Sequence, residues 1–251
     1  MKAYQAVFER FEQKYMMNEE QYHTLIPLLE KFMQWDEYGL CTICTLYFDT
    51  DDYSVARMSS NNKNYKEKLR LRSYGVPDSD DIVFAELKKK TGGVVYKRRT
   101  ALTCEDAESS LEIGKMPLPS MLLSVYNENS ELPTPCDPTQ ILSEISWFVN
   151  RWSPSPKVML CYERLAMFGK ENPLFRVTFD FNARWRVTEL NLSSGDGGTA
   201  LFDSKCGQYC LMEIKTWGAV PVDLSRILSQ MGVFPISYSK YTNACRIIAN
   251  R

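Results

Sequence analysis

Lys68-Leu69-Arg70-Leu71-Arg72 alternates basic and apolar residues with a period of two. Successive side chains of a strand point to opposite faces, so this stretch predicts a β-strand with the three cations on one face and the two leucines on the other. Six predicted strands carry a polar face with arginine, lysine and glutamate. One such face is ordinary, because one side of an antiparallel sheet commonly meets water. The repetition is what indicates a function.

The composition is that of an ordinary globular protein, but its charge is uneven. The 251 residues are 44% hydrophobic and 24% charged, enough to bury a sizeable core. The net charge of −1 gives no global attraction to nucleic acid or membranes. Between residues 63 and 99, however, 11 Lys and Arg outnumber 5 Asp and Glu. This pattern indicates an anionic ligand held at a site, with no nucleic-acid partner. No apolar run is long enough to predict a membrane segment.

The cysteines and the single histidine argue against two other kinds of chemistry. Eight cysteines fit no disulfide framework in a chain of this length, and no signal peptide is recognisable. We therefore expect a cytoplasmic protein with reduced thiols. Cys41-x-x-Cys44 and Cys206-x-x-x-Cys210 together resemble a zinc pattern, but the apolar run around Cys44 favours core cysteines. His23 stands alone, which argues against imidazole metal ligation and a histidine general base.

The alternation of polar and apolar residues predicts a sheet of several strands. We expect strands at Tyr4–Tyr15, Cys41–Thr50, about Tyr65–Tyr74, Val83–Lys90, Val94–Leu102, Lys157–Phe168, Phe175–Val187 and Tyr209–Trp217. Thr91-Gly92-Gly93 indicates a hairpin, so the strands on either side of it should pair antiparallel.

Helical signals lie between and after these strands. Asn18 and Gln21 form a capping box ahead of a stripe at Tyr22, Leu25, Leu29, Phe32 and Met33, with a kink or restart expected at Pro27. Asp137-Pro138 is a good helix start before Ile141, Ile145, Phe148, Val149 and Trp152. Val222–Met231 also has helical spacing. We expect one domain over residues 1–251 with a helical insertion at about 103–155.

The charged faces are the functional signal. Arginine is suited to bidentate phosphate contacts, and these faces are rich in it. The opposite faces are apolar and several helices are available to cover them. We therefore expect an α+β fold with helices packed on the apolar faces, and the charged faces would line a concave interior if the sheet closes. A lining of unpaired cations is unfavourable unless a polyanion such as a chain of phosphates occupies it.

The few acidic residues on these faces have two interpretations. Glu12 beside Lys14 and Glu213 beside Lys215 can pair with neighbouring cations. They can equally hold a divalent ion that bridges phosphate oxygens. Oxygen ligands without His or Cys suit Mg²⁺ or Mn²⁺.

An ordered set of short motifs resembles a known family. The motifs are Arg10-x-Glu12-x-Lys14-Tyr15, Tyr47-Phe48-Asp49-Thr50, Lys68-Leu-Arg70-Leu-Arg72, Glu86-Leu-Lys88, Tyr96-Lys97-Arg98-Arg99, Tyr162-Glu163-Arg164, Arg176-x-Thr178-x-Asp180 and Glu213-Ile-Lys215. From about Phe8 to Tyr241 the chain resembles the VTC domain, the polyphosphate polymerase branch of the CYTH-like triphosphate tunnel metalloenzymes. The resemblance implies an α+β fold in which a closed antiparallel β-barrel forms a tunnel, with helices packed outside.

The resemblance also implies roles for individual residues. Phosphate-binding tunnel positions of the family match Lys14, Arg70, Arg72, Lys88, Arg164 and Arg176. Tyr162 matches a tyrosine that lines the site, Glu213 matches the metal-binding glutamate, and Lys240 matches a basic residue near the tunnel end. Lys68 and Lys215 are further substrate-binding candidates, Glu12 is a second metal candidate, and the choice between Lys97 and Arg99 stays open.

Three functions are compatible with this lining. The first is an ATP-dependent polyphosphate polymerase that transfers the γ-phosphate of ATP onto a polyphosphate chain, with Mn²⁺ or Mg²⁺ as cofactor. The attacking phosphate oxygen is already anionic, so no general base is required. The second is a metal-dependent triphosphatase acting on tripolyphosphate or nucleoside triphosphate. The third is a polyphosphate-binding module without catalysis.

Overall fold

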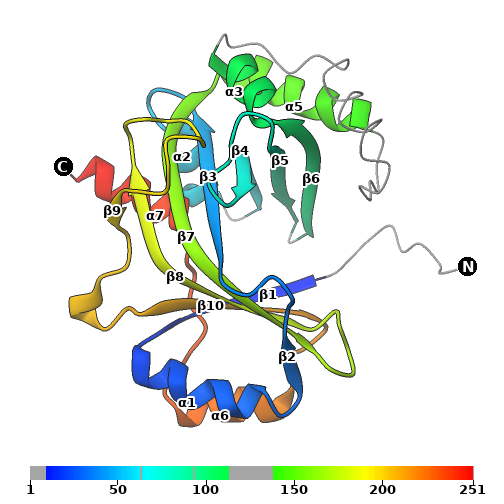
Figure 1. Cartoon of the computed structure of the whole chain (residues 1–251), viewed down its shortest axis with the longest axis vertical. Helices are drawn as coiled ribbons and strands as arrows, with labels where there is room; N and C mark the ends of the chain where they lie inside the picture. The colour runs from blue at the N-terminus through cyan, green and yellow to red at the C-terminus, as the bar shows by residue number, and fades with distance from the viewer. Residues whose placement is uncertain (1–9, 63, 93, 113–137, 251) are drawn as a thin grey trace, which may run out of the picture. The chain divides into compact units, whose positions relative to one another are not determined.

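The fold is α+β, and the computed structural model describes residues 10–62, 64–92, 94–112 and 138–250 (Figure 1). The expected strand start at Tyr4 lies outside the described residues. The strands are β1 (Arg10–Met17), β2 (Met33–Trp35), β3 (Cys41–Asp49), β4 (Tyr65–Tyr74), β5 (Ile82–Thr91), β6 (Val94–Thr103), β7 (Ser155–Gly169), β8 (Arg176–Arg186), β9 (Thr199–Ala200) and β10 (Cys210–Trp217). The helices are α1 (Glu19–Leu29), α2 (Ser54–Asn61), α3 (Cys104–Glu112), α5 (Pro138–Trp152), α6 (Val222–Gln230) and α7 (Lys240–Ala249), with a 3₁₀ turn η1 at Ser204–Cys206.

The chain divides into two compact units, each assembled from separate stretches of sequence. The first unit comprises Met1–Cys41, Glu163–Ala183 and Phe202–Tyr238, and the second comprises Thr42–Tyr162, Arg184–Leu201 and Ser239–Arg251. Strands β7 and β8 each contribute residues to both units. The expectation of one domain with a helical insertion stays a prediction, and α3 and α5 are the described parts of that insertion.

In the first unit, two helices cover the apolar face of an antiparallel sheet. The strand order is β1-β10-β8-β7, and β2 pairs with β7. Helices α1 and α6 lie along the sheet in Figure 1. Their apolar stripes join one core with the inward residues of the strands, including Tyr22, Leu25, Leu29, Leu224, Leu228, Val177, Phe179, Met212 and Ile214. The polar face of β1, β8 and β10 is thereby left for other contacts.

In the second unit, the organising stretch of the sequence lies in β4, as predicted. The strand order is β7-β3-β4-β5-β6, and β5 and β6 form the expected antiparallel hairpin. Leu69 and Leu71 are 3% and 1% exposed, and they pack in a core that includes residues of α3 and α5. The predicted assignment of the two faces of this strand is therefore confirmed.

The sequence correctly predicted where α1 begins but not where it ends. The Asn18 side chain accepts from the backbone N–H of Gln21 at 2.8 Å, and the Gln21 side chain accepts from the Asn18 N–H at 3.0 Å. This capping box was expected. The apolar stripe was extrapolated too far, because α1 ends at Leu29 and Met33 belongs to β2. Pro27 lies inside α1 two residues before that end, and no restart follows.

The prediction of a closed barrel was wrong. Closure requires every strand to have two hydrogen-bonded neighbours. In the described part of the chain the strand order is linear, begins at β1 and ends at β6. Alternation of side chains shows which face a strand presents, but it carries no information on whether the first and last strands pair. Among the described helices, none has the length and apolarity required to cross a membrane.

The cysteines follow the core expectation only in part. Cys44 and Cys210 are buried, and the Cys44 and Cys161 sulfur atoms lie 3.6 Å apart in the second unit. Cys206 is exposed, because it lies in the η1 turn, where its thiol donates to the Asp203 carboxylate at 3.0 Å.

Candidate functional site

The register of β4, β5 and β6 arranges cations of the second unit in rows. Lys68 pairs with Lys88, which pairs with Lys97, and we call these three the lysine row. The next row, two residues along each strand, is Arg70, Glu86 and Arg99, which we call the arginine row. The third row is Arg72, Phe84 and Ala101. Six cations and one carboxylate therefore occupy nine neighbouring positions of one sheet face.

Glu86 is the counterion at the centre of these rows. Its carboxylate is fully buried and accepts from Arg70 Nε at 2.7 Å and from Arg99 Nε at 2.7 Å. Lys97 Nζ lies 2.7 Å from the same carboxylate. Burial alone would raise the pKa of Glu86, but the surrounding cations hold it well below its ordinary value. One ionised glutamate thus fixes several cations without neutralising the group.

The pKa values of two neighbouring side chains, Tyr47 and Lys97, are lowered at this site. Burial raises the pKa of the Tyr47 phenol, yet Arg70, Arg72 and Lys68 lower it more strongly, and the result is about 8. Desolvation and the nearby arginines lower the pKa of Lys97 to about 7, although Glu86 acts in the opposite direction. Because the cations lower the pKa of Tyr47 in spite of its burial, the potential at this site is positive and attracts anions.

Aromatic side chains hold the cations of this face in place. Tyr47 stacks on Tyr241 of α7 with ring centroids 4.4 Å apart, and Arg70 donates to the Tyr47 hydroxyl at 3.0 Å. Arg72 donates to the Tyr162 hydroxyl at 3.3 Å, and Lys240 Nζ lies 4.3 Å from the centre of the Tyr162 ring. Tyr162 and Lys240 therefore lie together with the rows of β4, although they are far apart in sequence.

Asp49, the last residue of β3, has a structural role. Asp49 is fully buried, and its carboxylate accepts from the backbone N–H groups of Val55 and Ala56, each at 2.9 Å. These are first-turn amides of α2, which has no capping side chain of its own at Tyr53. Tyr241 also donates to Asp49, at 2.6 Å. Asp49 thus joins α2 to α7.

The first unit carries a second charged surface, made of paired acids and bases. Lys14 is opposite Glu213 and Glu12 is opposite Lys215 on the paired strands β1 and β10. Lys14 Nζ lies 3.0 Å from Glu12 Oε1, and Lys215 Nζ lies 2.8 Å from Glu213 Oε1. Burial would raise the pKa of Glu213, but Lys215, Lys14 and Arg164 hold it well below its ordinary value. Glu213 is therefore ionised at neutral pH.

The two arginines of the first unit that were predicted to bind phosphate differ in how firmly they are held. Arg164 forms a bidentate pair with the buried carboxylate of Asp180, at 2.6 and 2.9 Å. Arg176 is 44% exposed, and its guanidinium group lies 3.7 Å from the Asp36 carboxylate. Thr178 pairs with Glu213 in the sheet, and within the described residues its buried hydroxyl has no hydrogen-bond partner.

Few of the described side chains could serve as ligands of a metal ion. In the described ranges no three His, Cys, Asp or Glu side chains are grouped closely enough to hold a metal ion. Mg²⁺ in phosphate sites needs only one or two protein carboxylates, since water and phosphate oxygens supply the rest. The ionised Glu213, the neighbouring Glu12 and the unpartnered Thr178 hydroxyl are oxygen donors that fit this limited role.

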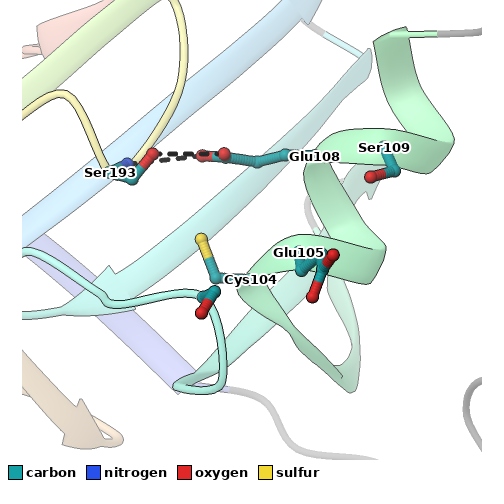
Figure 2. A pocket seen from close by; sticks show the side chains of 6 residues that line it. Cys104, Glu105, Glu108, Ser109 and Ser193 are labelled. Atoms are coloured by element: carbon teal, nitrogen blue, oxygen red, sulfur yellow. Dashed lines mark hydrogen bonds between the residues drawn. The ribbon is translucent and has the colours of Figure 1, made fainter.

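A pocket elsewhere in the second unit has a different character. It has a volume of about 310 Å³ and is lined by Ser79, Cys104, Glu105, Glu108, Ser109 and Ser193. Figure 2 shows the Glu108 carboxylate reaching Ser193, whose hydroxyl donates to it at 3.2 Å. The described lining carries acids and hydroxyls without a cation, so it does not suit a phosphate.

The structure therefore groups the predicted site residues into two sets. Within the second unit lie Lys68, Arg70, Arg72, Lys88, Lys97, Arg99, Tyr162 and Lys240. Within the first unit lie Glu12, Lys14, Arg164, Arg176, Glu213 and Lys215. Sequence reasoning missed Glu86 and Tyr47 as members of the second set. Their position on the charged face of β5 and β3, in register with Arg70, is the signal that identifies them.

Solved structures and a family model resemble this chain. A candidate adenylate cyclase from Bacillus halodurans superposes with a TM-score of 0.51 at 14% identity, over 94% of this chain and 96% of that one. A candidate adenylyl cyclase from Hippeastrum, described as having a dominant triphosphatase activity, gives a TM-score of 0.49 at 14% identity, over 92% of each chain. No curated protein matches in sequence. The family model of the VTC domain matches residues 9–249, and the chain therefore belongs to the VTC domain family.

Proposed function

We propose that this protein is an ATP-dependent polyphosphate polymerase that transfers the γ-phosphate of ATP onto the end of a polyphosphate chain. The single observation that carries the proposal is the cation-rich face of β4–β6, where six cations share one sheet face with one buried carboxylate. Membership of the VTC domain family supports a triphosphate or polyphosphate substrate for that face.

The excess charge of this face suits phosphoryl transfer. The transferred group and the two oxygens on either side of it carry negative charge throughout the reaction, so catalysis rests on position and charge stabilisation. Arg70 and Arg99 are held by Glu86 with their guanidinium groups fixed, which reduces the reorganisation needed on binding. The pKa of Tyr47, lowered by Arg70, Arg72 and Lys68 despite burial, supports an anionic substrate on this face.

The chemical step requires no base from the protein. A terminal oxygen of the acceptor chain attacks the γ-phosphorus of ATP, a new P–O bond forms, and the bond to the β–γ bridging oxygen breaks. ADP leaves with that oxygen and its electron pair. The acceptor oxygen carries no proton that must be removed, which agrees with a face built from arginine, lysine and tyrosine.

Glu213 and Glu12 are the residues that we propose would hold Mn²⁺ or Mg²⁺, with the Thr178 hydroxyl close to Glu213 in the sheet. When bound, such an ion would neutralise charge on the phosphate oxygens. Lys14, Lys215 and Arg176 of the same unit would contact phosphate directly.

Triphosphate hydrolysis is the second candidate function. The ionised carboxylate of Glu213 among cations favours it, because a hydrolase must orient a water molecule and a carboxylate can do so. Incubation of the pure protein with ATP and Mn²⁺, followed by a polyphosphate gel and measurement of ADP and orthophosphate, separates the two. Chains that lengthen as ADP is released support the polymerase. Orthophosphate without chain growth supports the hydrolase, and binding without turnover overturns both.

A further inference from the structure

The cation-rich face has a direction along its strands. The lysine row comes first, the arginine row second, and Arg72 with Phe84 third. Tyr74 follows Arg72 by two residues and so shares its face. Each two-residue step along a strand advances about 7 Å. Along β4, β5 and β6 the cations are thus concentrated at one end of the face, and the rings that these strands themselves contribute to it, Tyr74 and Phe84, lie at the other. We call Tyr74 and Phe84 the aromatic end.

Tyr74 is exposed and yet held in position. Its side chain is 52% exposed, although large aromatic residues are generally well buried. The hydroxyl accepts from Arg99 at 2.9 Å, and the ring meets the edge of Phe84 at 5.9 Å and 79°. The Arg99 guanidinium lies 4.3 Å from the centre of the Phe84 ring. The contacts that order Tyr74 thus come from a residue of the arginine row, and a large part of Tyr74 still faces solvent.

Other exposed aromatic residues of this unit lack that connection. Tyr96 is 44% exposed, but it pairs with Lys89, and both side chains alternate to the face opposite the rows. Trp147 of α5 is 51% exposed and is flanked by Lys89 and Arg151 at 5.5 and 5.1 Å from its ring centre. Because Trp147 contacts Lys89, it lies on the side of the sheet opposite the rows of cations. Tyr74 is the exposed ring that adjoins the arginine row.

We propose that the aromatic end binds the nucleoside of a nucleoside triphosphate, whose phosphates then extend along the arginine row towards the lysine row. The inference rests on the proposed function and adds to it which end of the face takes which part of the substrate. Bases stack on aromatic side chains irrespective of sequence, and a neighbouring guanidinium adds a cation–π contact. Inorganic tripolyphosphate has no base that could stack on the aromatic end. The aromatic end should therefore contribute to the binding of a nucleoside triphosphate but not to the binding of tripolyphosphate.

The test compares ATP and tripolyphosphate by calorimetric titration of three variants. Tyr74→Leu should weaken ATP binding about tenfold, the order expected for one lost stacking contact, and leave tripolyphosphate within about twofold. Tyr74→Phe keeps the ring and should retain most of the ATP affinity. Tyr96→Leu removes a similarly exposed tyrosine from the opposite face and should change neither ligand. Thermal melting of each variant without ligand establishes that it is folded.

The outcomes separate this inference from the proposed function. Suppose that the wild type binds both ligands, and that Tyr74→Leu either weakens the binding of both equally or weakens the binding of neither. The aromatic end then has no role in nucleoside binding, and the inference fails while the proposed function stands. If Tyr96→Leu has the same effect as Tyr74→Leu, the assignment to the aromatic end also fails. If wild type binds neither ATP nor tripolyphosphate, the proposed function falls and takes the inference with it.

Discussion

At the scale of single residues, Glu86 has the largest energetic consequence. Removing one partner of a buried ion pair costs about 3–5 kcal/mol, because the other charge stays buried without compensation. Arg70 and Arg99 keep some access to water, so we expect Glu86→Gln to lower the free energy of unfolding by about 3 kcal/mol. Urea unfolding measures this, and bound tripolyphosphate should recover part of the loss. Glu144→Gln is the control, since Glu144 pairs with Lys89 and Arg98 at a more exposed site and should cost no more than about 1 kcal/mol. Equal stability of the two variants would contradict the central role of Glu86.

Lys97 and Tyr47 make ligand affinity depend on pH. Above a pKa of about 7, Lys97 loses its positive charge, and above a pKa of about 8, Tyr47 gains a negative one. Both changes disfavour an anion, so affinity for tripolyphosphate should fall as pH rises through this range. Titrations at a series of pH values test this. The Lys97→Arg variant stays protonated and the Tyr47→Phe variant cannot ionise, so each should flatten part of the profile. A profile that neither variant changes would assign the titration to other groups.

Glu213 distinguishes a metal ligand from a structural ion pair. The Glu213→Gln substitution keeps the shape of the side chain but removes the charge that attracts a divalent ion. We expect Mn²⁺ to bind at least about tenfold more weakly to this variant in the presence of tripolyphosphate, with turnover lost. Tripolyphosphate binding without metal should be retained or strengthened, because Lys215 loses its ion-pair partner and the negative charge opposite Lys14 is removed. Calorimetric titration of Mn²⁺ measures the change, and unchanged metal affinity with retained activity would remove Glu213 from the site.

At the scale of elements, the sequence predicted the strands in which polar and apolar residues alternate. The charged and apolar faces of β4 were correctly assigned, since a slip by one residue would have buried Arg70 in place of Leu69. The end of α1 and the open edges of the sheet were not predictable in this way. An apolar residue such as Met33 suits a helix stripe or a strand equally, and pairing between distant strands depends on tertiary contacts that alternation does not encode. The sequence named candidate site residues one by one, and their roles stay predictions, whereas the place of Glu86 and Tyr47 beside them required the register.

The contact between α2 and α7 through Asp49 gives a prediction for elements. Asp49→Ala removes the acceptor of the Val55 and Ala56 amides and the partner of the Tyr241 hydroxyl. We expect a loss of about 2–3 kcal/mol and faster hydrogen exchange at both amides. Asp52→Ala is the control, because Asp52 is an exposed acid in the same turn that pairs with Arg57. Unchanged exchange at Val55 and Ala56 would show that α2 does not depend on this cap.

At the scale of the whole molecule, the protein is nearly neutral, with a net charge of −1, while its candidate site is strongly positive. Any attraction to a phosphate chain is therefore local to the rows of cations and is not a property of the overall charge. Salt shortens the range of such an attraction to about 10 Å at 0.1 M. We accordingly expect tripolyphosphate binding to weaken at least about tenfold between about 0.05 M and about 0.5 M salt.

A matched pair of variants tests where that salt dependence arises. Lys88→Gln and Lys205→Gln remove the same charge from the chain, but Lys88 lies in the lysine row and Lys205 lies in the exposed η1 turn. Lys88→Gln should lower the affinity and make it less sensitive to salt, because one fewer cation meets the phosphate chain. Lys205→Gln should leave both quantities within error of the wild type, because net charge alone has little effect on a local site. Titrations at four salt concentrations give the slopes. Equal slopes for the two variants would mean that the anion is bound by the general field of the protein and that the rows on β4, β5 and β6 do not form its site.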